Sequence, residues 1–245
     1  MSLRAIGRRI AGERLLGWLD FFRNPEMEWT WGGPFNGQMF RQRIFFELLH
    51  CHRPSALVET GTFHGATTSL LAATALPVFT TEVGRRHFAY SRARFLFQRN
   101  VHGYNLDSRV FLRELVARAA LPAGNHFFYL DAHWSGDLPL REELTIIFEG
   151  WERPLVMIDD FEVPGAGYGF DTYGPTQTLD LAYIGPVVGA HDLQVFFPSV
   201  DSSVETGARR GCAVLCRPVD RQAIEDSVTT LRRVAPSAIS TADAH

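Results

Sequence analysis

The sequence predicts a doubly wound α/β fold, with a mostly parallel seven-stranded sheet and helices on both of its faces. From residue 55 onward, short apolar runs alternate with stretches of helical length, which is the pattern of strands joined by crossover helices. The 245 residues are 46% hydrophobic and 21% charged, a composition that suits one well-buried domain. In addition, residues 57–68 combine a short apolar run that ends in an acid, a glycine turn, and the small residues that open a helix.

The chain divides into three parts in this prediction. Residues 1–54 form a helical segment before the sheet, residues 55–235 form the domain, and residues 236–245 form a flexible polar tail. The first segment begins with an arginine-rich amphipathic helix, whose apolar positions include Leu15, Leu16, Trp18, Leu19 and Phe22. Such a helix packs on its own domain, joins two copies of the chain in a homodimer, or binds a membrane surface.

A polar aromatic loop at residues 28–38 leads from this helix to a second helix at residues 39–50. Linkers seldom carry two tryptophans and a phenylalanine. We therefore expect the loop either to pack against the body of the domain or to fold over a ligand.

Strands and helices then follow one another along the chain. Strands are predicted at residues 56–59, 78–83, 126–130 and 154–158, with a short one within 101–107, and helices at 67–76, 86–99, 112–120 and 138–150. A glycine- and tyrosine-rich loop at residues 164–175 follows. A helix from residue 176, two closing strands at 193–197 and 212–216, and a final helix at 221–234 complete the fold.

Composition excludes several classes of function. The net charge of −3 gives no reason to expect nucleic acid as a partner. Three cysteines without a framework spacing indicate a reduced, cytoplasmic protein. No run approaches the roughly 18 apolar residues that a transmembrane helix needs. All 24 basic residues are arginines, so no lysine is present to act as a base or to form a Schiff base.

The turn at residues 59–65 is the first candidate for ligand binding. Gly61 and Gly65 let the backbone turn sharply and approach a ligand, because neither carries a Cβ. Glu59 ends the strand, at the edge where open α/β sheets bind their ligands. The spacing differs from the Gly-x-Gly-x-x-Gly of dinucleotide-binding proteins, and an acid before the turn would crowd a pyrophosphate.

Further acids follow the other predicted strands, namely Glu82, Asp131 and the pair Asp159-Asp160. One acid after a strand is usually a helix N-cap, whereas several at one sheet edge face the same crevice. Glu82 fits a ribose contact, because a carboxylate accepts hydrogen bonds from both hydroxyls. Asp131, Asp159 and Asp160 suit a shared divalent cation such as Mg²⁺, since unpaired they would repel one another. The alternative is that Asp160 caps the following turn.

Two further positions carry candidate chemistry. His133 is a base that works near neutral pH, and beside a metal-bound hydroxyl it would accept the proton, with Asp131 as the adjoining catalytic acid. A metal-ligand or capping role for His133 is the alternative. Trp134 packs or forms a wall of a substrate pocket. Asp107 and Ser108 are placed to bind an adenine edge.

Residues 55–216 resemble a class I S-adenosylmethionine-dependent methyltransferase, in particular the metal-dependent O-methyltransferase branch. Residues 59–65 match the first motif of the family, Glu82 its ribose-binding acid, and Asp107-Ser108 its adenine-side position. In relatives the segment before the first strand also closes over the cofactor. The resemblance implies a Rossmann-like fold and cofactor contacts from Glu59, Gly61, Thr62, Phe63, Gly65, Glu82, Asp107, Ser108, Asn36, Gly37 and Gln38.

The same resemblance implies a divalent ion, Mg²⁺ or a similar cation, on Asp131, Asp159 and Asp160. The sequence departs from catechol-type enzymes because it has no lysine base after the fourth strand. The run at residues 131–134 is more similar to antibiotic-sugar enzymes, where a nearby histidine has that role.

The expected activity is O-methylation of a hydroxyl on a small molecule, of sugar or phenolic type. Tyr168 and Tyr173 lie in the loop that we expect to cover the substrate, beside Trp134. With Glu82, the acid at Glu59 favours a cationic sulfonium cofactor over an anionic pyrophosphate. The alternatives are an NAD-dependent oxidoreductase on the same fold and a non-catalytic relative that binds the cofactor.

Overall fold

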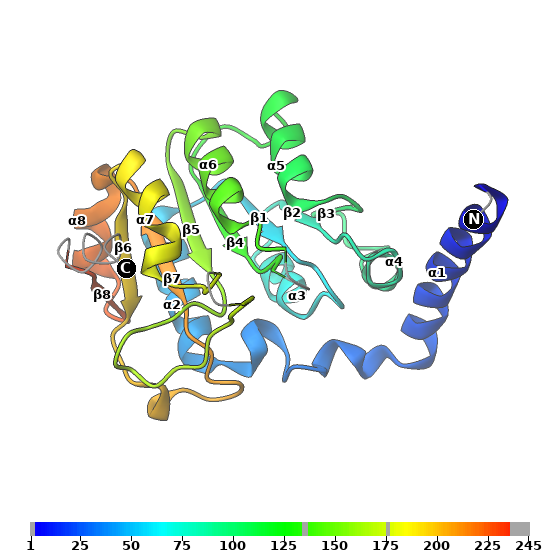
Figure 1. Ribbon diagram of the computed structural model, residues 1–245, viewed down its shortest axis with the longest axis horizontal. Helices are drawn as coiled ribbons and strands as arrows, with labels where there is room; N and C mark the ends of the chain where they lie inside the picture. The colour runs from blue at the N-terminus through cyan, green and yellow to red at the C-terminus, as the bar shows by residue number, and fades with distance from the viewer. Residues whose placement is uncertain (1–2, 134–136, 175–176, 236–245) are drawn as a thin grey trace.

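The computed structural model describes residues 3–133, 137–174 and 177–235, and the side chains from residue 12 onward within these ranges. Trp134, Thr176 and the predicted tail therefore lie outside the described residues. The described chain forms an α/β fold built on a central sheet of eight strands, with helices packed on both faces (Figure 1). The predicted fold class is confirmed, with one strand more than expected.

The sheet has the strand order β3-β2-β1-β4-β5-β7-β6-β8. Its parallel strands are β1 (Ala56–Thr60), β2 (Val78–Thr81), β3 (Val101–Tyr104), β4 (His126–Leu130) and β5 (Pro154–Ile158). Antiparallel pairing joins β7 (Ala213–Cys216) to β5 and to β6 (Gln194–Pro198), and β6 to β8 (Leu231–Arg233). The order reverses between β1 and β4, and ligands bind outside the carboxyl ends of strands at such a point.

The additional strand corrects the prediction of a final helix at residues 221–234. Helix α8 spans Pro218–Ser227, and the chain then turns back to pair β8 with β6. At the turn, the backbone N–H and the hydroxyl of Thr230 donate to Glu47 Oε2, at 3.1 and 2.9 Å. This long-range contact replaces the next helical hydrogen bonds, so the helix ends early.

Two layers of helices bury both faces of the sheet. Helices α5 (Ser108–Ala117), α6 (Leu140–Gly150) and α7 (Leu181–Ala190) pack on the face that carries Val58 and Phe128. Helices α2 (Met39–His52), α3 (Ala66–Ala73) and α8 pack on the face that carries Leu57 and Phe127. Successive side chains of a strand point to opposite faces, so β1, β2, β4 and β5 are buried at every position rather than at alternate ones.

Helix α1 (Leu3–Arg23) lies beside α4 (Arg85–Arg94) at one end of the molecule (Figure 1). Gly17 permits a close approach, since a Cβ there would lie 2.1 Å from the carbonyl oxygen of Arg86. Asp20 Oδ2 and Arg86 Nε form an ion pair at 2.6 Å. The helix therefore packs on its own domain, whereas three of its predicted apolar positions are exposed, namely Leu15, Leu16 and Phe22.

A segment with the 3₁₀ turns η1 (Pro25–Trp29) and η2 (Pro34–Gly37) runs from α1 to α2. Glu205, which follows the 3₁₀ turn η3 (Ser202–Val204), accepts hydrogen bonds from the backbone N–H groups of Phe40 and Arg41 at 2.9 and 3.0 Å. It thereby satisfies the open N–H groups at the start of α2. None of the helices in the described ranges combines the length and the apolar character that crossing a bilayer requires.

Candidate functional site

A cavity of about 430 Å³ lies between the carboxyl edge of the parallel strands and the segment that precedes α2. The predicted residues that line it are Asn36, Glu59, Gly61, Thr62, Phe63, Glu82, Asp131, His133, Asp160 and Tyr173. The other predicted residues with described positions are outside its lining, namely Gly37, Gln38, Gly65, Asp107, Ser108, Asp159 and Tyr168. The turn after β1 and the acids of the neighbouring strands thus meet in one space.

The turn between β1 and α3 depends on two glycines with positive φ. Gly61 has φ 92°, and a Cβ there would lie 2.2 Å from the carbonyl oxygen of Asp131. Gly65 has φ 81°, and a Cβ there would lie 2.5 Å from the ring of Phe95. Only glycine combines this backbone conformation with these approaches, so the turn can lie directly against the loop after β4.

Glu59 is a buried carboxyl at the floor of the cavity. Its Oε2 accepts hydrogen bonds from the hydroxyls of Thr68 and Thr80, at 2.5 and 2.6 Å. Burial raises the pKa of Glu59 to about 7, because the loss of hydration outweighs the two hydroxyl donors. Near neutral pH this group therefore changes charge readily in response to a ligand.

Glu82 follows β2 and is held by backbone donors at both of its oxygens. The N–H of Phe63 donates to Oε2 at 2.8 Å, and the N–H of Gly84 donates to Oε1 at 2.7 Å. Burial raises the pKa of Glu82 above its ordinary value. The two hydrogen bonds fix the orientation of the carboxylate, which can still accept hydrogen bonds from hydroxyl groups in the cavity.

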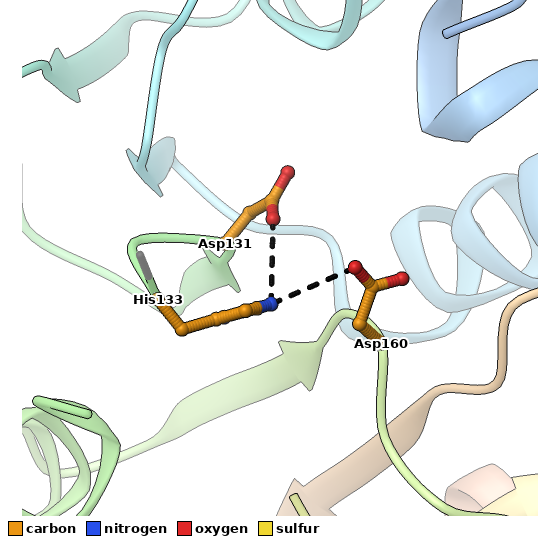
Figure 2. A group of neighbouring side chains, drawn as sticks. All are labelled: Asp131, His133 and Asp160. Atoms are coloured by element: carbon orange, nitrogen blue, oxygen red, sulfur yellow. Dashed lines mark ion pairs between the residues drawn. The ribbon is translucent and has the colours of Figure 1, made fainter. Parts of the chain in front are cut away.

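Asp131, His133 and Asp160 form an acidic group at the other end of the cavity (Figure 2). His133 Nε2 lies 3.7 Å from Asp131 Oδ1 and 3.7 Å from Asp160 Oδ2, too far for hydrogen bonds. The histidine is only 6% exposed, and Nε2 has no hydrogen-bond partner among the residues that the structure describes. One atom from each residue lies within 4.8 Å of the others, so all three can reach one cation between them.

The charges of this acidic group influence one another strongly. Burial raises the pKa of Asp131, and the neighbouring Asp160 raises it further. Burial also acts to raise the pKa of Asp160, but the neighbouring His133 and the guanidinium groups of Arg210 and Arg41 favour its ionised form and bring the pKa below the ordinary value. For His133, the attraction of the carboxylates outweighs burial and raises the pKa. The group therefore holds protons that a bound cation would displace.

Asp159, which we predicted as a metal ligand, points away from this acidic group. It is fully buried and forms an ion pair with Arg41 of α2. The hydroxyl of Tyr129 donates to Asp159 Oδ2 at 2.5 Å, and Asn36 Nδ2 donates to it at 3.3 Å. The structure thus brings together Asp131 and Asp160 as predicted but places His133, not Asp159, as the third member.

The loop that we expected to touch a ligand contributes one of its three predicted residues to the cavity. Asn36 lines it, whereas Gln38 is fully buried and holds the backbone of Arg210. Gln38 Nε2 donates to the Arg210 carbonyl at 2.8 Å, and its Oε1 accepts from the Arg210 N–H at 2.6 Å. Gly37 accepts a hydrogen bond from the hydroxyl of Thr206. The loop therefore packs against the body of the domain and contributes to the cavity wall, while its contact with a ligand stays a prediction.

The predicted adenine-side pair has a structural role in this conformation. Asp107 is the N-cap of α5 and accepts from the N–H of Arg109 at 2.9 Å. Its other oxygen pairs with the Arg109 guanidinium at 2.7 Å. Ser108 is the first residue of that helix and is buried. The capping role is the one that the geometry supports for Asp107.

Arg210 and Asp171 also line the cavity and were missed in the sequence. Arg210 Nε lies 2.9 Å from Asp160 Oδ1, and the same guanidinium pairs with Asp171. The hydroxyl of Tyr173 lies 2.7 Å from the carbonyl oxygen of His133 and 3.0 Å from Asp171 Oδ2. Asp171 is the one acid of the loop at residues 164–175, a signal that the sequence offered.

No protein-family model and no curated protein matches the sequence. Among solved structures, the chain is similar to an O-methyltransferase from Bacillus cereus in complex with S-adenosylhomocysteine. The two are 16% identical with a TM-score of 0.51, and the match covers 72% of this chain and 80% of that one. It is also similar to the O-methyltransferase TomG from Streptomyces achromogenes, involved in tomaymycin synthesis and bound to S-adenosylmethionine, with 16% identity and a TM-score of 0.51 over 72% and 79%. The chain has the Rossmann-like fold of class I methyltransferases.

Proposed function

We propose that this protein is an S-adenosylmethionine-dependent methyltransferase that methylates a hydroxyl of a small molecule with the help of a divalent cation. One observation carries the proposal: a single cavity joins a glycine turn with two fixed carboxyls to an acidic group with an unpartnered histidine nitrogen. The first end suits a cofactor with hydroxyl and ammonium groups. The second suits a cation that orients a substrate hydroxyl.

The cofactor would lie against the turn, where Gly61 allows close approach of the backbone. Glu82 would accept the ribose hydroxyls, because its orientation is already fixed by two N–H groups. Glu59 would receive the ammonium end of the cofactor, directly or through water, and would become ionised on binding. The O-methyltransferases of similar fold that are bound to S-adenosylhomocysteine and S-adenosylmethionine support this choice. Asp107 and Ser108 stay predicted contacts of the adenine.

The acidic group fits a divalent cation. Two carboxylates and a buried ring nitrogen, which has no partner in the described part of the chain, surround one point, and such a nitrogen otherwise costs desolvation free energy. The imidazole favours Mn²⁺ relative to Mg²⁺, since nitrogen is a softer ligand than oxygen. When bound, the cation would lower the pKa of a substrate hydroxyl and stabilise the resulting oxyanion.

His133 would act as a ligand of the cation rather than as the base that accepts the substrate proton. A single lone pair on Nε2 cannot both ligate a cation and accept a proton, and this nitrogen is the one that faces Asp131 and Asp160. Asp159 would support the site without touching the cation. It is the counter-ion of Arg41 and would keep the backbone of Asp160 in place. Tyr173 would form part of the substrate wall. Much of the rate enhancement would come from positioning, because the cofactor already activates the methyl group.

Isothermal titration tests the cofactor assignment. We expect S-adenosylmethionine to bind the wild type and NAD⁺ not to bind, with weaker S-adenosylmethionine binding in Glu82→Gln. Equal binding in that variant would contradict the ribose contact, and binding of NAD⁺ alone would support an oxidoreductase.

Cofactor turnover over a panel of hydroxylated sugars and phenols tests the reaction. We expect formation of S-adenosylhomocysteine with Mg²⁺ or Mn²⁺ and its loss on addition of EDTA. In His133→Gln, lost Mn²⁺ binding assigns the histidine to the cation. Retained Mn²⁺ binding with lost turnover assigns it to proton transfer instead.

A further inference from the structure

The guanidinium of Arg210 occupies a fixed position at the edge of the acidic group. Both polar ends of the Gln38 amide bond the Arg210 backbone, at 2.6 and 2.8 Å. The buried Arg41 also donates to the carbonyl oxygens of Arg210 and Gly211. These contacts come from the segment before the sheet and hold the main chain on both sides of Arg210. The side chain is therefore presented to the cavity from a rigid base.

Asp160 lies between this guanidinium and the place of a cation. Its Oδ1 is 2.9 Å from Arg210 Nε, and its Oδ2 faces His133 Nε2 at 3.7 Å. Arg210 also pairs with Asp171, which belongs to the loop between β5 and α7. The positive charge of Arg210 is thus divided between an acid of the candidate cation site and an acid of the loop.

A divalent cation on Asp160 would be repelled by this guanidinium, since both share one carboxylate in a partly buried setting. The repulsion is weakest when Asp171 neutralises part of the arginine charge. Asp171 therefore favours cation binding without touching the cation, whereas Arg210 opposes it.

We propose that Arg210 is a built-in competitor of the divalent cation and that Asp171 sets how strongly it competes. This inference rests on the cation site of the proposed function. It makes Arg210 and Asp171 positioning residues that link the affinity for the cation to the position of the loop. By reciprocity, a bound cation stabilises the loop in the position that pairs Asp171 with Arg210.

Mn²⁺ binding, followed by electron paramagnetic resonance of the free ion, tests the proposal. Arg210→Gln removes the charge but keeps a hydrogen-bond donor, and we expect about tenfold tighter binding. Asp171→Asn keeps the shape and removes the neutralising charge, and we expect about tenfold weaker binding. Arg209→Gln is the matched control on the exposed neighbouring arginine, and it should leave the affinity unchanged.

Opposite signs in these two variants are the diagnostic result, since a merely structural role would weaken binding in both. Weaker or unchanged binding in Arg210→Gln overturns the proposal. Arg210→Lys keeps the charge and should retain the wild-type affinity, so it decides the matter if the glutamine variant does not fold. A wild type that binds no Mn²⁺ overturns the cation site itself, and this inference with it.

Hydrogen exchange of the loop at residues 164–174 tests the link from the other direction. We expect Mn²⁺ to slow exchange there in the wild type and to have no such effect in Asp171→Asn. Exchange that is insensitive to Mn²⁺ in the wild type would overturn the coupling to the loop.

Discussion

Carboxyl groups lie at both ends of the cavity, but their surroundings differ. At the end with the glycine turn, Glu59 and Glu82 receive hydrogen bonds from hydroxyls and backbone N–H groups of the chain. At the other end, Asp131 Oδ1 and His133 Nε2 lie 3.7 Å apart, and within the described ranges this ring nitrogen has no hydrogen-bond partner. Carboxyls that the chain has already oriented suit a ligand with its own hydroxyl groups. Carboxyls that converge on an open point suit a cation.

The same contrast separates two adjacent residues. Asp159 is enclosed by Arg41 and Tyr129, whereas Asp160 faces the cavity. We therefore expect Asp159 to affect the stability of the fold and Asp160 to affect the binding of ligands.

The largest effect is expected from Asp159→Asn, because it leaves the charge of Arg41 buried without its counter-ion. Removing one partner of a buried ion pair costs about 3–5 kcal/mol of unfolding free energy. Urea unfolding measures this loss. Asp160→Asn is the matched control and should cost far less, since Asp160 is partly exposed. Equal losses in the two variants would remove the distinction between them.

The next effect is on cation binding. Asp131→Asn should weaken Mn²⁺ binding by more than about 100-fold, because loss of residues that only support a metal ligand already costs about 10- to 100-fold. S-adenosylmethionine binding, measured on the same sample by titration calorimetry, should change little. Glu149→Gln, an exposed acid on α6, serves as the control. Unaltered Mn²⁺ binding in Asp131→Asn would show that the ion binds elsewhere.

The reciprocal variant is Glu82→Gln at the cofactor end. It should weaken S-adenosylmethionine binding by about 10- to 100-fold, the range for a lost hydrogen bond to a charged group. Mn²⁺ binding should stay at the wild-type value. If either variant weakens both ligands equally, the two ends are not independent, and the comparison between them fails.

The smallest effect concerns pH. Burial holds the pKa of Glu59 near 7, so the group is largely neutral at pH 6 and ionised at pH 8. A ligand ammonium prefers the ionised form, so S-adenosylmethionine affinity should rise a few-fold, roughly, over this interval. Titration calorimetry at each pH measures the slope, and Glu59→Gln should abolish it. An equal slope in that variant would assign the effect to another group.

Glu59 also links pH to the stability of the ligand-free protein. Its pKa is higher in the folded than in the unfolded state, so the folded state retains the proton longer as pH rises. Stability from this group therefore falls between the ordinary pKa of glutamate, 4.5, and about 7, and is constant above that value. Where the two ranges overlap, from pH 6 to about 7, the affinity for the ligand should therefore rise while the stability of the ligand-free protein falls.

Local sequence patterns predicted those features of the site that depend on residues close together in the chain. The glycine turn and the acids after successive strands were found because the carboxyl ends of parallel strands meet at one edge of the sheet. The orientation of each acid was not predictable in this way. Asp159 and Asp160 are neighbours, and Asp159 is the one that pairs with the buried Arg41, from a helix before the sheet.

The residues that were missed depend on contacts between distant parts of the chain. Arg210 lies in a polar stretch without periodicity, and its position is set by Gln38. The short strand β8 is likewise set by Glu47, which bonds Thr230. No pattern within a window of a few residues carries such information.

The cap that Glu205 provides for α2 has a consequence for biosynthesis. Residues of the segment before the sheet depend on partners far downstream in the chain: Phe40 and Arg41 on Glu205, and Gln38 on Arg210. As the chain leaves the ribosome, the parallel strands can pair while this segment still lacks its supports. We therefore expect the cavity to be completed only after Glu205 and Arg210 have been synthesised, and a chain truncated before Glu205 to lack the contacts that hold the segment before the sheet over the glycine turn.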